Sequence, residues 1–108
     1  MTNKITFNYK GKPYVLEYTR DSVKEMELRG FVAEDVLKKP FTVLPTLFAG
    51  AFIANHRFTK RKLIDEIFSK MDDKGALVNA LAEMYSLVID EFVDELEKRN
   101  KESTWKRI

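Results

Sequence analysis

KITFNYKGKPYVLEYT, from Lys4 to Thr19, is the stretch that decides the fold class of this chain. Apolar and polar residues alternate at 5–9 and again at 14–18, which is typical of strands with one buried face. Between them lies KGKP, where Gly11 can adopt the positive φ of a tight turn and a proline ends the turn. The sequence therefore predicts a β-hairpin. Because two strands alone are marginally stable in water, their aromatic face must pack on helices from the rest of the chain.

The residues after the hairpin carry helix signals. Capping-type residues precede VKEMELRG and Gly30 supplies a stop, so a first helix is expected. Pro45 is tolerable only in a first turn, which places the start of the second helix near 42–45. We predict an α+β, mainly α, single compact domain over residues 1–97 and a polar C-terminal tail at 98–108. The domain consists of a hairpin at 5–18 packed on a bundle of about four helices, at about 20–29, 43–56, 60–71 and 75–98.

Composition and charge narrow the functional classes. The chain has 108 residues, with 19 lysines and arginines against 17 aspartates and glutamates, so its net charge of +2 gives nucleic-acid binding no global support. It contains no cysteine, which removes disulfides, thiolate nucleophiles and cysteine metal sites and suits a reducing compartment. The N-terminal MTNKITF lacks the apolar core of a signal peptide, so we do not expect secretion.

The most apolar segment is FTVLPTLFAGAFIANH, Phe41 to His56. A membrane-spanning helix needs about 20 mainly apolar residues, and this shorter run contains a proline, a glycine and an asparagine, so we expect no membrane partner. A lone Gly50 without a glycine pattern does not form a phosphate-binding loop. Two interpretations remain open. The segment is a core helix in which Gly50 admits a close neighbour, or it leaves Phe48 and Phe52 as a surface for a partner.

The helix predicted at 75–98 carries two apolar stripes. The first comprises Leu77, Leu81, Met84 and Val88, and the second comprises Val78, Tyr85, Ile89, Phe92 and Leu96. A helix with so wide an apolar arc is either central to the core or involved in association. We infer association, because three short helices and a hairpin are a small cover for both stripes. The predicted protein-binding residues are Phe48, Phe52, Tyr85, Ile89, Phe92 and Leu96.

The polar residues show no pattern of catalytic, cofactor-binding or metal-binding chemistry. His56 is the single histidine, which excludes a two-histidine metal site within one chain, and we expect it to be a structural residue at a helix end. Asp72 and Asp73 lack the ligand spacing of a calcium loop. We therefore expect no enzyme activity, no cofactor and no metal. The best basic patch is formed by Arg57, Lys60, Arg61 and Lys62. It suits a phosphate backbone or an acidic protein surface, but acidic residues lie close to it in the sequence.

The order of these features resembles the small proteins encoded in phage and prophage tail gene clusters, among them the tail assembly chaperones. The resemblance spans about residues 4–92, and its segments are KITFNYKGKPYVLEYT, EMELRGF, LPTLFAGAFIANH and KGALVNALAEMYSLVIDEF. It implies a non-enzymatic helper that acts in the host cytoplasm and binds the tape measure protein and the tail tube protein during virion morphogenesis. Such helpers are usually missing from the finished particle.

Three functional hypotheses follow from the sequence. The leading one is a phage tail assembly chaperone that binds apolar helices of the tape measure protein. The second is a structural tail or connector component that forms a homo-oligomer and stays in the virion. The third, which the near-neutral charge disfavours, is a small nucleic-acid-binding regulator that uses the basic patch.

Overall fold

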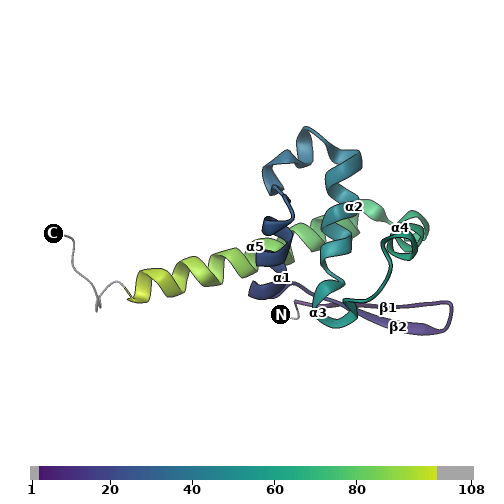
Figure 1. The fold of residues 1–108 in the computed structure, drawn as a ribbon, viewed down its shortest axis with the longest axis horizontal. Helices are drawn as coiled ribbons and strands as arrows, with labels where there is room; N and C mark the ends of the chain where they lie inside the picture. Colours follow the sequence, from purple (N-terminus) through teal and green to yellow (C-terminus); the bar gives the residue numbers. More distant parts are fainter. Residues whose placement is uncertain (1–2, 100–108) are drawn as a thin grey trace.

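The computed structural model of the protein describes residues 3–99 and has an α+β fold that is mainly helical, as the sequence predicts. A two-stranded antiparallel hairpin comes first and the helices follow it (Figure 1). The elements are β1 (Ile5–Tyr9), β2 (Lys12–Leu16), α1 (Arg20–Leu28), the 3-10 helix η1 (Ala33–Leu37), α2 (Pro40–Gly50), α3 (Ile53–His56), α4 (Arg61–Lys70) and α5 (Lys74–Arg99). Of the polar tail predicted at 98–108, residues 98 and 99 belong to α5, and residues 100–108 lie outside the described part of the chain.

A two-residue turn, Lys10 and Gly11, joins β1 to β2. The φ angles of these residues are 49° and 79°, both positive as a type I′ turn requires. The turn sets a register in which Phe7 lies opposite Tyr14, and their rings stack with centroids 5.3 Å apart. Tyr14 and Leu16 are buried, so one face of the hairpin rests on the helices as predicted.

A capping box starts α1. The Thr19 hydroxyl accepts a hydrogen bond from the backbone N–H of Ser22 (3.1 Å), and the Ser22 hydroxyl accepts one from the backbone N–H of Thr19 (2.8 Å). Val23 and Met26 are buried on the inner face of the helix. Gly30, with a φ of 96°, follows the helix and ends it. This first helix therefore forms as its sequence signals predict.

The single helix predicted at 43–56 is two helices, α2 and α3, separated by a tightened turn at Ala51 and Phe52. The N–H groups of these two residues donate to the carbonyls three residues earlier, those of Phe48 and Ala49, at 3.1 Å each. The carbonyl of Ala51 accepts the N–H of Glu17, just after β2, at 3.2 Å. The break thus provides a partner for the backbone of the hairpin.

The start of α2 also differs from the prediction, because the helix begins at Pro40 rather than near 42–45. Pro40 occupies the first helical position, where its fixed φ suits a helix and an N–H group is not needed. Pro45 lies inside the helix, where its missing N–H removes one backbone hydrogen bond without ending the helix. The helices predicted at 20–29, 60–71 and 75–98 are confirmed to within one residue at each end.

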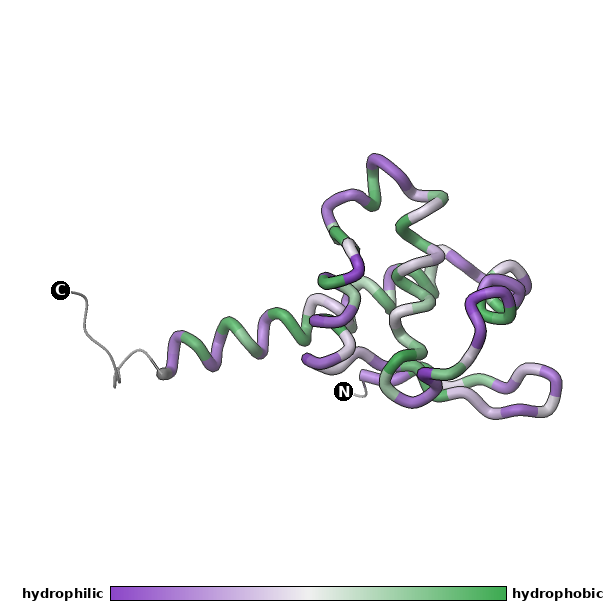
Figure 2. Tube along the Cα trace, viewed as in Figure 1, coloured by the Kyte–Doolittle hydropathy of each residue, from purple (hydrophilic) through white to green (hydrophobic). Residues whose placement is uncertain are grey.

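The long helix α5 passes through two environments. Its first half crosses the core, where Leu77 and Leu81 belong to the same buried cluster as Ile67 of α4. Its second half extends away from the body (Figure 1), and apolar and polar residues alternate along this part (Figure 2). The molecule is consequently elongated, with Cα extents of 57 × 30 × 25 Å.

Candidate protein-binding surface

Three of the residues predicted to bind a partner lie in the core. Phe48, Phe52 and Tyr85 are 0%, 1% and 8% exposed. The Phe48 ring packs against those of Phe52 and Phe68, with centroids 5.2 Å and 5.0 Å away, and Tyr85 meets Tyr18 edge-on at 5.5 Å. Side chains enclosed in this way cannot contact a partner, so the prediction is wrong for these three. The alternative interpretation, a core helix, describes α2.

Gly50 lies where α2 approaches α1. A Cβ added to this glycine would be 2.3 Å from Met26 Sδ and 2.4 Å from Met26 Cε, closer than non-bonded atoms can approach. Glycine at this position therefore leaves room for the buried thioether of α1. This contact explains why a residue that weakens a helix is present in α2.

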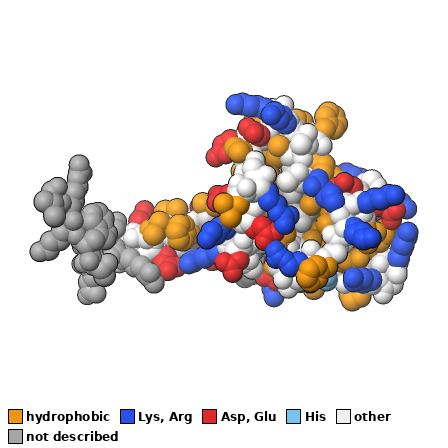
Figure 3. All heavy atoms as spheres, viewed as in Figure 1, with side chains coloured by type: hydrophobic (Ala, Val, Ile, Leu, Met, Phe, Trp, Pro, Cys, Tyr) orange, Lys and Arg blue, Asp and Glu red, His pale blue; other side chains and the backbone are white. Residues whose placement is uncertain are grey.

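The other three predicted residues lie on the extended half of α5. Ile89, Phe92 and Leu96 are 36%, 47% and 49% exposed, and Val93, which was not among the predicted residues, is 43% exposed. At 3.6 residues per turn these four side chains share one face of the helix, which we call the α5 stripe. Tyr85 lies one turn earlier on the same face, where the body still covers the helix. Apolar side chains are visible along the extended helix in Figure 3.

Two grooves flank Ile89, the first residue of the stripe. One, of about 460 Å³, lies between α1 and α5, with Val23 on one wall and Phe92 on the other. The second, of about 490 Å³, lies between η1 and α5 and is lined by Val32 and Tyr85. The stripe is therefore continuous with hollows in the body that can accommodate side chains of a partner.

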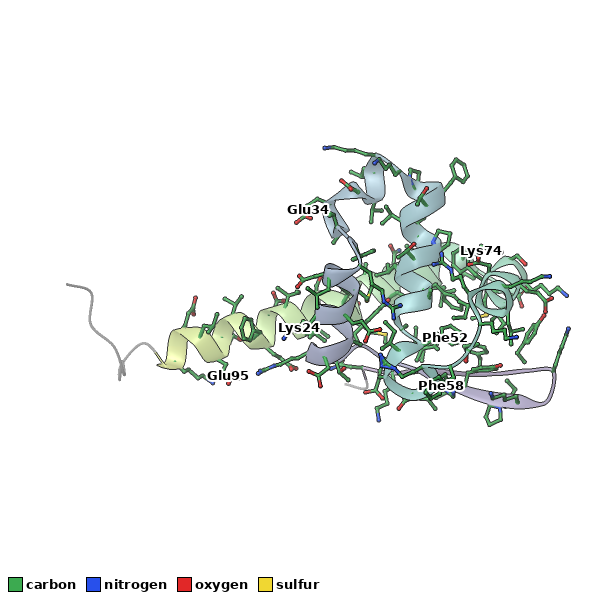
Figure 4. All side chains as sticks on the ribbon, in the orientation of Figure 1. Lys24, Glu34, Phe52, Phe58, Lys74 and Glu95 are labelled. Carbon is green, nitrogen blue, oxygen red and sulfur yellow. The ribbon has the colours of Figure 1, made fainter. Side chains whose placement is uncertain are left out.

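Arg20, the first residue of α1, contacts the extended helix. Its guanidinium carbon lies 5.5 Å from the centroid of the Phe92 ring, and the same group forms an ion pair with Glu95, which is labelled in Figure 4. These contacts join α1 to α5 beyond the core. The guanidinium lies over one face of the Phe92 ring, and Phe92 remains about half exposed.

Residues 1–107 match the model of a protein family described as a domain of unknown function, DUF5055. The chain belongs to the DUF5055 family. No curated protein and no solved structure was found to match it. The binding surface of this DUF5055 chain is therefore assigned from the burial and contacts of its own residues.

His56 has a structural role in the DUF5055 fold. Its Nε2 accepts the backbone N–H of Val15 in β2 at 3.0 Å, and the Asn55 amide donates to the carbonyl of Val15 at 3.2 Å. Burial, followed by the charge of Lys12, lowers the pKa of His56, which favours the neutral ring that can accept this hydrogen bond. The expected structural role at a helix end is confirmed. Asn55 and His56 together cover the outer edge of β2.

The basic patch takes part in ion pairs within the chain. Arg57 lies 2.5 Å from a carboxylate oxygen of Glu25, and Arg61 lies 2.8 Å from one of Asp65. These pairs reduce the positive charge that the patch can offer to a phosphate backbone. The structure therefore adds no support for the nucleic-acid hypothesis.

A contact that sequence reasoning missed joins the hairpin turn to α4. The Tyr9 hydroxyl donates to Glu66 Oε2 at 2.5 Å, and Lys10 Nζ lies 3.4 Å from the same oxygen. The hydrogen bond from Tyr9, followed by that from Lys10, lowers the pKa of Glu66. No local pattern could have predicted this contact, because 57 residues separate its partners.

Asp72 and Asp73 belong to the turn before α5. The Asp73 carboxylate accepts the backbone N–H of Ala76 at 3.3 Å, as residues near a helix start do. Among residues 3–99, no group of three or more His, Cys, Asp or Glu side chains is arranged to hold a metal ion. No helix in that part of the chain combines the length and the apolar character needed to cross a membrane.

Proposed function

We propose that this protein is a phage tail assembly chaperone, a non-enzymatic protein that binds the tape measure protein and tail tube subunits during tail morphogenesis in the host cytoplasm. The observation that carries the proposal is the α5 stripe, an exposed apolar face on a helix that extends beyond the body. The resemblance of the segments between residues 4 and 92 to proteins of phage tail gene clusters indicates the biological setting.

The α5 stripe is suited to binding another amphipathic helix. Such helices associate by burying their apolar faces against each other. The first half of α5 is fixed in the core through Leu77, Leu81 and Met84, so the helix that presents the stripe is already ordered before a partner binds. An ordered binding face lowers the entropic cost of association. A chaperone of this kind covers the apolar helices of a long partner until that partner is assembled.

Several ionisable side chains whose pKa values are shifted by the fold make structural contacts. The Tyr18 hydroxyl is buried and donates to the carbonyl of Leu47 at 2.6 Å, and burial raises the pKa of Tyr18. His56 and Glu66 bond to the hairpin. These engagements support a function in binding rather than in acid-base chemistry.

Co-expression with the tape measure product of the same tail gene cluster tests the proposal. We expect the soluble fraction of that product to rise with the wild-type protein and to fall again with Phe92→Ser. The matched control is Phe58→Ser, because Phe58 is 94% exposed and lies away from α5 (Figure 4); this variant should act as wild type. If the tape measure product is no more soluble with the protein than without it, the proposal is wrong.

A structural tail component that forms a homo-oligomer is the second candidate function. The observation that favours it is the same α5 stripe, because an exposed apolar face can also pair two copies of one chain. Mass spectrometry of purified particles separates the two candidates. A chaperone should be missing from the particles, whereas a structural component should be retained in a fixed ratio to other tail proteins.

A further inference from the structure

The groove between η1 and α5 has an acidic wall. Glu27 of α1, Glu34 of η1 and Asp90 of α5 line it, and the described residues that line it include no lysine or arginine. Ile89 and Tyr85 provide apolar surface in the same groove. Burial, followed by the charges of Glu27 and Glu34, raises the pKa of Tyr85. This hollow is therefore apolar and negatively charged.

The acidic character continues along α5 beyond the groove. Because successive residues of a helix are about 100° apart, Glu97 lies on the same flank of the α5 stripe as Asp90. By the same geometry Glu91 and Asp94 point away from the α5 stripe, and Asp94 lies within about 40° of Asp90 around the helix. All four carboxylates belong to exposed residues. One flank of the stripe thus presents two carboxylates, Asp90 beside the groove and Glu97 about two helical turns further along.

We infer that the groove between η1 and α5, together with the α5 stripe, binds an amphipathic helix whose polar flank carries lysine or arginine. Apolar side chains of the bound helix cover Ile89, Phe92 and Leu96, and its cations lie beside Asp90 and Glu97. Complementary charge of this kind selects a partner and its orientation. This inference rests on the proposed function, and it specifies the chemistry of the partner segment that is bound.

The same charges disfavour other occupants. Two copies of this chain paired antiparallel through the stripe would bring Asp90 and Glu97 of one copy toward the same residues of the other, and like charges at an interface oppose association. Phosphate groups of nucleic acids and of anionic lipids would meet the same repulsion. A basic helix of another protein is the occupant that satisfies both the apolar stripe and its acidic flank.

Two synthetic peptides measured against the full-length protein test the inference. Both are amphipathic helices of about 20 residues with the same leucine positions, one with lysines and the other with glutamates on the polar flank. Fluorescence anisotropy of the labelled peptides should show the lysine peptide binding at least about tenfold more tightly, with an affinity that falls as salt rises. Phe92→Ser should abolish this binding, and Phe58→Ser should not.

A pair of charge-reversed variants locates the effect. Asp90→Lys with Glu97→Lys should remove or reverse the preference for the lysine peptide. Glu91→Lys with Asp72→Lys changes the net charge by the same amount at exposed residues away from this flank and should leave the preference within about twofold of wild type. Equal effects of the two double variants would overturn the inference, because they would indicate general charge attraction rather than a defined flank.

The outcomes also separate this inference from the proposed function. If light scattering shows a dimer that Phe92→Ser converts to a monomer, the stripe is covered by a second copy and the inference is overturned. If the peptides are not distinguished but Phe92→Ser still prevents solubilisation of the tape measure product, the basic helix is wrong and the chaperone proposal stands. If the peptides are distinguished but that product is never solubilised, the chaperone proposal fails and the preference for basic helices stands.

Discussion

Replacement of Gly50 by alanine tests the packing of α2 on α1. The added Cβ would lie 2.3 Å from Met26 Sδ, 2.4 Å from Cε and 3.0 Å from Cγ, so the thioether must move. Met26 is buried, and a groove of about 380 Å³ lined by Met26, Gly50 and Phe52 lies beside it. The end of the methionine side chain can turn toward this groove, but it then loses part of its packing against the core.

Two opposing contributions determine how Gly50→Ala changes the free energy of unfolding: overpacking against Met26 and the higher helix propensity of alanine. Overpacking of a core costs about 1–3 kcal/mol, whereas glycine to alanine gains at most about 1 kcal/mol in a helix interior and less at Gly50, the last residue of α2. Gly50→Ala should therefore lower the free energy of unfolding by about 1–2 kcal/mol. Met26→Ala should cost about 2–5 kcal/mol because it leaves a cavity. In the Met26→Ala background, Gly50→Ala meets no thioether and should raise the free energy of unfolding by up to about 0.5 kcal/mol.

Urea denaturation of the four proteins in this cycle, followed by circular dichroism, measures the coupling. Gly75→Ala is the control, because nothing lies within 4 Å of a Cβ added to Gly75. Its effect should be the same in the wild-type and Met26→Ala backgrounds to within about 0.5 kcal/mol. The reasoning is refuted if Gly50→Ala also has the same effect in both backgrounds.

Mild acid should weaken the fold through His56, because the pKa of His56 is lowered on folding. Below about pH 6.5 the unfolded chain binds more protons than the folded chain, so the free energy of unfolding decreases as the pH is lowered. Urea unfolding at a series of pH values should show this slope, and an undiminished slope in His56→Gln would assign it to other groups. Tyr18→Phe should lower the free energy of unfolding by about 1–2 kcal/mol, because the carbonyl of Leu47 loses a buried donor; urea titrations that gave equal stability would contradict this. Because the pKa of Tyr18 is raised on folding, stability should also fall above pH 10.0 in the wild type, and less steeply in Tyr18→Phe. Leu96→Ser should shift the melting temperature little, because that side chain is half exposed, and a large decrease would show that the α5 stripe contributes to the core.

The hairpin and three of the helices were predictable because their signals are local. Alternation at 5–9 and 14–18 identifies the strands, and Gly11 supplies the positive φ of the turn. The Thr19 and Ser22 side chains start α1, and Gly30 ends it. Each of these signals acts over a few residues, so it can be recognised in the sequence without knowledge of tertiary contacts.

The segment from Phe41 to His56 shows where local signals are insufficient. The segment contains Pro45, and Pro40 lies just before it. The prediction placed Pro45 in the first turn of the helix, but the helix begins at Pro40. The break at Ala51 coincides with a hydrogen bond from Glu17, and Asn55 and His56 complete the cover of the strand edge. These bonds join residues far apart in sequence, so no pattern within the segment indicates where the helix must break.

The amino-acid sequence alone determined the fold class, the positions of most elements and the apolar face of α5. The tertiary structure alone decided which part of that face is open: Tyr85 and Ile89 are one helical turn apart, yet the first is buried against Tyr18 and Phe31 and the second begins the exposed stripe. Helical spacing places side chains on a common face. Burial depends on neighbours contributed by distant segments, and these exist only after the chain has folded.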